Sequence, residues 1–267
     1  MTEIASEGQQ QLEPVRAVRK KADSAWLVVM LTIIGAMIVA IVFSDAYQEA
    51  FREIIPGLKL TLVLTLGAFM VSMPLGLFIG IGRLSKNPVI NTVSRVYIEF
   101  VRGMPMLVFI FVVAFVLTRD VADLLGIKTR SIPMEWRGGA ALCLFYAAFI
   151  AEVFRAGIQS VDDGQVEAGL AVGLSRWQTN RHIVLPQALR NALPALGNDF
   201  IALMKDTSLV SVLAVTELTQ QARIYSGSSF RIRESFFILA VVYVSLTLLL
   251  SLALQVWERK LEIPGPS

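Results

Sequence analysis

The chain contains several apolar runs that approach the length needed to cross a lipid bilayer. A transmembrane helix needs about 20 predominantly apolar residues. Hydrophobic residues make up 55% of the 267 and charged residues only 17%, whereas soluble domains average about 45–50% apolar and about 25% charged residues. Because a water-facing core cannot bury this excess, the runs predict an all-α protein that spans a membrane several times.

About six transmembrane helices are expected. Their predicted limits are residues 25–43, 58–82, 103–117, 138–156, 195–218 and 236–256. Segment 44–57 resembles a short interfacial amphipathic helix. In the second span, Gly76 and Gly80 have the G-x-x-x-G spacing that lets helices approach closely. The first span is too long for a signal-peptide core and lacks a good cleavage site, so we expect it to remain as an anchor.

Lysine and arginine residues near the spans predict which side of the membrane each loop occupies, since cytoplasmic loops carry an excess of them. With the N-terminus inside, the inner segments hold 14 of these residues and the outer loops hold 9. The bias places both termini and the polar loop 161–194 in the cytoplasm.

The charge distribution and the scarcity of cysteine and histidine argue against a nucleic-acid site and a His/Cys metal site. The net charge of +3 is small and the basic residues are spread along the chain, so no concentrated basic surface points to nucleic acid. The only cysteine, Cys143, and the only histidine, His182, leave no His/Cys cluster for a metal.

The loop 161–194 is polar, yet its sequence has the signals of helices. Asp162 or Asp163 can cap a first helix, whose positive end favours acidic side chains. Gly173 stands where a helix ends in a residue with positive φ. The small residues around Ala168 suit entry into a groove of another protein.

A second helix follows in the same loop. Ser175 and Gln178 have the spacing of a capping box. Pro186 and Pro194 limit how far this helix can continue undistorted. The loop therefore predicts a helical hairpin at the membrane surface.

Six positions of this hairpin carry a family pattern, E-A-x-x-x-x-G followed by I-x-L-P: Glu167, Ala168, Gly173, Ile183, Leu185 and Pro186. The pattern resembles the signature of the membrane subunits of ATP-binding-cassette (ABC) importers, the binding-protein-dependent permeases. The phrases YIEFVRGMPML, FIAEVFRAGIQSV and LPQALRNALPALGNDFIALMKDTSL are similar to the polar-amino-acid permeases, which include histidine, glutamine, arginine and glutamate/aspartate importers. The resemblance implies the type I importer (MetI-like) transmembrane fold.

The resemblance covers roughly residues 58–260, which are expected to form the importer core. Residues 1–57 are expected to hold a cytoplasmic tail, a peripheral first helix and the interfacial segment, and 261–267 a short C-terminal tail. Two positions depart from the family. Gly169 replaces a second alanine, which should not abolish docking, and Met104 replaces a common threonine, which could alter the lining near the pathway.

The resemblance also implies partners. Two permease subunits, identical or paralogous, would form the path, a cytoplasmic ABC ATPase dimer would hold ATP–Mg, and an extracytoplasmic binding protein would deliver an amino acid. The chain has no G-x-x-x-x-G-K-[ST] phosphate loop, so we expect a transport subunit of the bacterial inner membrane with no catalytic residue and no cofactor of its own. The resemblance implies that the residues that couple the permease to the ATPase are Glu167, Ala168, Gly169, Gly173, Ile183, Leu185 and Pro186.

The solute path needs polar side chains inside the bilayer, where a charge at mid-helix costs about 2.5–3.5 kcal/mol. Lys205 and Asp206 interrupt the fifth span, followed by Thr207 and Ser208, whose hydroxyls could bind a carboxylate or repair a broken helix turn. Glu152 and Arg155 share a helix face at i, i+3. The candidate pathway residues are Glu152, Arg155, Lys205, Asp206, Thr207, Ser208 and Met104.

Structural alternatives exist for these charges. Lys205 and Asp206 could form an internal ion pair that holds the fold, and Glu152 and Arg155 an interfacial pair near the cytoplasm. Arg102 is expected to pair with Glu99 on the cytoplasmic side.

Two other functions compete with the permease. A secondary amino-acid transporter would explain the intramembrane charges but would usually show paired repeats with interrupted spans, which the six segments lack. A membrane hydrolase could use Lys205 and Ser208 as a Ser/Lys nucleophile pair, but no oxyanion-hole phrase accompanies them. The permease hypothesis explains the hairpin, the missing phosphate loop and the polar fifth span together.

Overall fold

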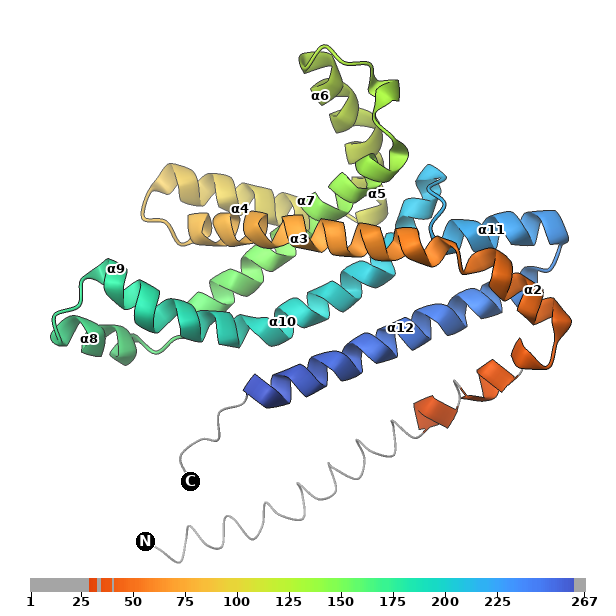
Figure 1. Ribbon diagram of the computed structural model, residues 1–267. Coiled ribbons are helices and arrows are strands. Elements are labelled where there is room, and N and C mark those ends of the chain that lie inside the picture. Colours follow the sequence, from red (N-terminus) through yellow and green to blue (C-terminus); the bar gives the residue numbers. More distant parts are fainter. Residues whose placement is uncertain (1–28, 33–34, 40, 262–267) are drawn as a thin grey trace, which may run out of the picture.

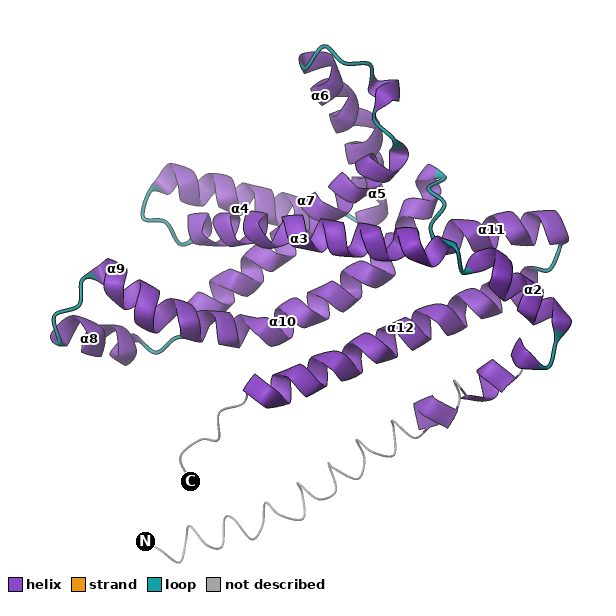
Figure 2. Ribbon diagram, viewed as in Figure 1, coloured by secondary structure: helices purple, strands orange, loops and turns teal. Residues whose placement is uncertain are grey.

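The computed structural model describes residues 29–32, 35–39 and 41–261, so part of the predicted first span, 25–43, lies outside the described residues. Every regular element in this part of the chain is a helix, which confirms the all-α prediction (Figures 1 and 2). The α-helices are α2 (Asp45–Ile54), α3 (Gly57–Arg83), α4 (Pro88–Arg102), α5 (Met106–Phe111), α6 (Thr118–Leu124), α7 (Met134–Gln159), α8 (Asp163–Ala171), α9 (Arg176–Thr179), α10 (Leu185–Asp206), α11 (Leu218–Ser229) and α12 (Ile232–Leu261). Shorter 3-10 or π segments are η1 (Val112–Leu117), η2 (Thr129–Ser131), η3 (Asn180–Val184) and η4 (Thr207–Leu213).

Three helices in the described part are long and apolar enough to cross a membrane: α3, α7 and α12. They correspond to the predicted second, fourth and sixth spans. The chain from α4 to α6 makes a fourth if it counts as one span, although it bends by 111° at the break between α4 and α5. The predicted number of six is therefore approximate.

The connection 83–102 between the second and third predicted spans is mostly helical, since α4 occupies Pro88–Arg102. Asn87 caps this helix by accepting a hydrogen bond from the Val89 N–H at 2.9 Å, and Pro88 suits its first position. Ile98 and Val101 are buried, so α4 packs one face on the bundle and leaves a stripe of apolar side chains outside.

The predicted fifth span, 195–218, begins and ends elsewhere. Helix α10 starts at Leu185, inside the polar loop, and runs through Pro194 to Asp206. The π segment η3 leads directly into α10, so Pro186 lies where the hydrogen-bond pattern changes from π to α. The 3-10 segment η4 follows α10, and the backbone then turns at Ala214, which has φ of 59°.

Helices α3 and α7 pack at close range through glycine, as the G-x-x-x-G spacing predicts. A Cβ added to Gly76 would lie 2.5 Å from Cγ2 of Ile150, and one added to Gly80 would lie 2.7 Å from the carbonyl oxygen of Ala151. The Ser72 hydroxyl adds a hydrogen bond to the Cys143 carbonyl at 3.0 Å. The contact forms the centre of the core, where Cys143 is buried as a small side chain.

Figure 1 shows how the two ends of the bundle differ. The hairpin of α8 and α9, the turn between α3 and α4, and the C-terminal end of α12 lie at the left of the view, whereas α2 and α11 lie at the right. Segment 44–57 forms α2, as predicted, and α2 packs against α11 and α12 through buried Ala50 and Ile54.

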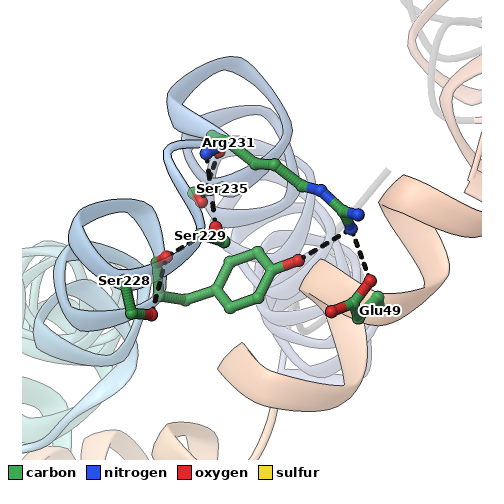
Figure 3. Close-up of polar contacts among 6 residues, drawn as sticks. Glu49, Ser228, Ser229, Arg231 and Ser235 are labelled. Carbon is green, nitrogen blue, oxygen red and sulfur yellow. Dashed lines mark hydrogen bonds and ion pairs between the residues drawn. The ribbon is translucent and has the colours of Figure 1, made fainter.

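An ionic contact fastens α2 to the turn between α11 and α12 (Figure 3). The Arg231 guanidinium donates hydrogen bonds to the Glu49 carboxylate and, at 3.2 Å, to the Tyr225 hydroxyl. Ser229 and Ser235 close the turn, each by a bond of 2.7 Å, to the Tyr225 and Arg231 carbonyls respectively. The hydrogen bond with Glu49 raises the pKa of Arg231.

Candidate functional site

The first helix of the predicted coupling hairpin has the expected start and stop. The Asp162 carboxylate accepts a hydrogen bond from the Gly164 N–H at 2.7 Å and so caps α8. Helix α8 ends at Ala171, with Val172 as its C-cap. The next residue, Gly173, has φ of 87°, and the Leu174 N–H donates to the Gly169 carbonyl at 3.1 Å. This pairing is the Schellman motif, which needs a residue with positive φ at the position of Gly173.

The second half of the hairpin begins with the predicted capping box. The Gln178 N–H donates to the Ser175 hydroxyl at 3.3 Å, and the Ser175 N–H donates to the Gln178 side-chain oxygen at 2.8 Å. The π segment η3 then joins α9 to α10. Because Pro186 cannot donate a backbone hydrogen bond, the wider π turn just before it gives the preceding carbonyls other donors.

The outer face of the hairpin combines one acid with apolar side chains. Glu167 and Ala168 are exposed, and Glu167 forms no ion pair within the described part of the chain. Val172 is 78% exposed and Trp177 64% exposed. These exposed side chains leave the predicted coupling residues accessible to a partner.

Two residues of the family pattern face the inside of the hairpin. Gly169 is buried, and a Cβ added there would lie 2.7 Å from Cδ1 of Ile183 and 3.0 Å from Cγ2 of Thr179. The glycine that replaces the second alanine of the family therefore brings α8 close to η3. Leu185 and Pro186 are exposed at the start of α10.

A cavity of about 630 Å³, whose wall includes charged side chains, lies between α7 and α10, beside the end of α4. It is lined by Arg102, Phe149, Glu152, Val153, Arg155, Ala156, Gly157, Ser160, Asn191, Ala192, Ala195 and Asp199. At Gly157 the two helices approach closely, since a Cβ there would lie 2.7 Å from the Ala188 carbonyl oxygen. A hydrogen bond of 2.8 Å from the Asn191 amide to the Ser160 hydroxyl links the same two helices.

Three of the charged side chains in this cavity form a network. Arg155 binds the Glu152 carboxylate with Nη2 at 2.8 Å and Nε at 3.1 Å, as the i, i+3 spacing predicts. Arg102 lies further from the same carboxylate, at 3.9 Å, and its guanidinium stacks over the Phe149 ring at 5.4 Å. The predicted pair of Arg102 with Glu99 does not form; Arg102 points from the end of α4 toward α7.

The fourth charge, Asp199, has an unsatisfied oxygen. Its Oδ2 is buried and has no hydrogen-bond partner in the described part of the chain. Leaving a buried acceptor without a donor costs roughly 1–3 kcal/mol, and more for a charged group. This oxygen is covered by protein although Asp199 lines the cavity, so the side chain must rotate before the oxygen can bind a cation in the cavity.

Only some of the seven predicted pathway residues line this cavity. Glu152 and Arg155 line the cavity, but the other five do not. Met104 is half-buried against the core. The Lys205 side chain is exposed, whereas Asp206 accepts a hydrogen bond from the Tyr146 hydroxyl at 2.7 Å, so the alternative of a Lys205–Asp206 ion pair does not occur.

Thr207 and Ser208 follow α10. Thr207 is buried and donates to the Met204 carbonyl at 2.6 Å, so it satisfies an acceptor at the broken end of α10, one of the two roles considered for it. Ser208 lies in η4, the 3-10 segment that follows α10 directly.

Arg102 and Asp199 were not among the predicted pathway residues. Asp199 could have been predicted from the sequence. Asn191, Ala195 and Asp199 are spaced four residues apart, so they share one face of the helix that starts at Leu185. Arg102 could not be found this way, since its position depends on the bend after α4.

The comparisons with known proteins show the family of the chain. The model of the family "Binding-protein-dependent transport system inner membrane component" matches residues 72–263. The chain belongs to this family. It is therefore a membrane permease subunit, a transport component and not an enzyme, and it is a multi-pass protein of the inner membrane.

Curated relatives cover most of the chain. The glutamine transport system permease protein GlnP of Escherichia coli K12 is 38% identical over 219 residues, which are 82% of this chain and 97% of GlnP. The probable amino-acid permease protein YxeN of Bacillus subtilis is 37% identical over 216 residues, which are 81% of this chain and 94% of YxeN.

Solved structures give the same fold. A crystal structure of an amino acid ABC transporter with histidines aligns with a TM-score of 0.70 and 37% identity, covering 80% of this chain and 95% of that one. The MetNI methionine ABC transporter in an inward-facing conformation aligns with a TM-score of 0.62 at 20% identity, over 83% of this chain and all of that one. The second likeness supports the type I importer (MetI-like) fold alone.

Proposed function

We propose that this chain is the permease subunit of an ATP-driven importer that carries a polar amino acid through the cavity between α7 and α10. The names of the relatives support an amino acid as the solute. The observation that carries the proposal is the buried, unpartnered oxygen of Asp199 in a cavity that also holds Arg102. A secondary transporter or a membrane hydrolase would not account for the family match.

The cavity has the two groups that bind the head of an amino acid. A zwitterion needs an acceptor for its ammonium group and a donor for its carboxylate. Asp199 is the proposed acceptor, because its free oxygen gains the missing hydrogen bond. Arg102 is the proposed donor, since its contact with Glu152 is long at 3.9 Å, its stacking on Phe149 uses no N–H group, and its planar fork suits a carboxylate.

Glu152 and Arg155 have a supporting role in this proposal. Their bond of 2.8 Å satisfies both charges on α7, so each keeps the other in place and Glu152 draws Arg102 into the cavity. The other pathway candidates, Lys205, Asp206, Thr207, Ser208 and Met104, lie away from the cavity and are kept as candidates for a further part of the path.

The hairpin 161–194 is the proposed attachment to the ATPase. Exposed Glu167 and Ala168, with Val172 and Trp177 beside them, offer a face for a groove of the partner. Ile183 and Gly169 would hold this face in shape, Gly173 would end it, and Leu185 and Pro186 would begin the helix that passes the movement to the cavity. Binding of ATP–Mg to the partner would favour one of two arrangements of the spans by contacting the hairpin differently in each.

The remaining parts of the assembly follow from the same proposal. Two permease subunits, of one or two kinds, would enclose the path, and an extracytoplasmic binding protein would deliver the amino acid. Both termini and the hairpin would lie in the cytoplasm, with residues 58–260 as the core, 1–57 as a tail and peripheral brace, and 261–267 as a short tail.

Gentle purification from native membranes tests the assembly. The tagged chain is extracted in several mild detergents, and the proteins that co-purify are identified by mass spectrometry. An ATPase with a phosphate loop, in near-equal amount, supports the proposal, and the permease composition then follows from the same sample. Recovery of the chain alone in every detergent would contradict it.

A further inference from the structure

We infer that the cavity selects amino acids whose side chains are uncharged and form hydrogen bonds. The inference rests on the proposed function, since it concerns the same cavity, and it adds the class of solute. The evidence is the balance of charge in the cavity wall and the chemistry at its far end.

The four ionisable side chains of the wall sum to zero: Arg102 and Arg155 against Glu152 and Asp199. Arg155 and Glu152 neutralise each other through hydrogen bonds of 2.8 and 3.1 Å. This leaves one cation, Arg102, and one carboxylate, Asp199, for the two charges that every amino acid carries on its head. No charged group of the wall is left over to pair with a charge on the solute's side chain.

The end of the cavity away from Asp199 is polar but neutral. Asn191 and Ser160 meet there, and the Asn191 amide donates to the Ser160 hydroxyl at 2.8 Å. The Asn191 side-chain oxygen has no protein donor in the described part of the chain, so it can accept a hydrogen bond from a solute. Between the two ends, α10 contributes only Ala192 and Ala195, which leave room for an extended side chain.

The spacing fits a solute with a polar group at the end of its side chain. Asn191 and Asp199 are eight residues apart on α10, which is about 12 Å along the axis at 1.5 Å per residue. Two side chains reaching into this gap, with a hydrogen bond at each end, leave room for an amino acid with an amide side chain. An arginine or lysine side chain would instead place its cation near Arg155, and a glutamate side chain would place an anion where no free cation remains.

Direct binding measures this preference without the binding protein, which has its own selectivity. The purified permease–ATPase complex is placed in phosphatidylethanolamine/phosphatidylglycerol nanodiscs and titrated with radiolabelled glutamine, leucine, arginine and glutamate. Glutamine should bind at least about tenfold more tightly than arginine or glutamate, because burying an unpaired charge is unfavourable. Leucine should bind more weakly than glutamine, since it offers no hydrogen bond to replace the water that it displaces from the exposed Asn191 side chain.

A substitution at the far end gives a second measurement. Asn191→Asp adds a carboxylate and should raise the affinity for arginine relative to glutamine at least about tenfold, whereas Asn191→Ser, the matched neutral change, should not. Equal or tighter binding of arginine or glutamate by the unaltered complex would overturn the inference. If arginine or glutamate binds the unaltered complex and this binding disappears in Asp199→Asn, the proposed function stands and only the solute class is wrong. If no amino acid binds the unaltered complex, both the proposed function and the inference fail.

Discussion

The Tyr146 hydroxyl donates a hydrogen bond of 2.7 Å to the Asp206 carboxylate, and so ties the middle of α7 to the last residue of α10. Tyr146 is buried, with 4% of its surface exposed. This bond gives the Asp206 carboxylate a hydrogen-bond donor that is not a cation. We therefore interpret Asp206 as a residue that holds the end of α10 in place.

Removal of this hydroxyl should destabilise the protein. Tyr146→Phe leaves the Asp206 carboxylate without its donor, and a hydrogen bond to a charged group contributes about 1.5–3 kcal/mol. The measurement is the thermal unfolding midpoint of the purified protein in detergent. Tyr47→Phe is the matched control, because the Tyr47 hydroxyl has no hydrogen bond in the described part of the chain; equal midpoints for the two variants would contradict the assignment.

The close contact of α3 and α7 makes a second prediction about glycine. Gly76→Ala places a methyl group against Ile150, and overpacking of a tight contact costs about 1–3 kcal/mol. Gly67 lies on the same helix with nothing within 4 Å of an added Cβ, so Gly67→Ala should be neutral or slightly stabilising. Resistance to unfolding in SDS compares the two, and a Gly67→Ala loss as large as that of Gly76→Ala would show that helix packing is not the cause.

Glu167 tests the proposed contact with the ATPase. Glu167→Lys reverses a charge on the exposed face of the hairpin and should lower ATP-driven uptake at least about tenfold, since a like charge across an interface costs several kcal/mol. The folded protein should persist in the membrane, because Glu167 forms no ion pair in the described part of the chain. Gln165→Lys, an exposed neighbour on the same helix, is the control. Unchanged uptake in Glu167→Lys would remove Glu167 from the coupling surface.

Gly169 tests the inward half of the hairpin. A Cβ at this position meets the end of the Ile183 side chain at 2.7 Å, so Gly169→Ala should lower the unfolding midpoint modestly and weaken coupling. Ile183→Val removes the opposing methyl group, and the double variant should recover most of the loss. Additive losses in the double variant would mean that Gly169 acts through the partner ATPase and not through Ile183.

The features of this fold that depend only on residues close together in the sequence could be predicted. The caps at Asp162 and Ser175 and the positive φ of Gly173 have the predicted geometry, because each rests on residues within one turn. The long apolar helices follow from composition in the same way. Gly76 also packs as its spacing predicts, since G-x-x-x-G describes one face of one helix.

The cavity could not be predicted in full, because it joins helices that are distant in the sequence. Arg102 reaches Glu152 only because α4 ends at a bend, and the sequence favoured the nearer Glu99. Asp199 reaches the cavity only because α10 begins at Leu185 and continues through Pro194, whereas proline suggested an interruption. Where charges compete for partners in a membrane, the tertiary arrangement decides which ones remain free.

The central claim, that an amino acid binds at Asp199 on its way through the cavity, is tested most directly by uptake. Proteoliposomes that hold the complete importer, with binding protein and ATP, are assayed with radiolabelled amino acids. Asp199→Asn should lower uptake at least about tenfold, since loss of one partner of a buried charged hydrogen bond costs about 2–5 kcal/mol, whereas Asn198→Ala, an exposed neighbour outside the cavity, should retain it. An Asp199→Asn importer that assembles normally and transports at the rate of the unaltered protein would contradict the account.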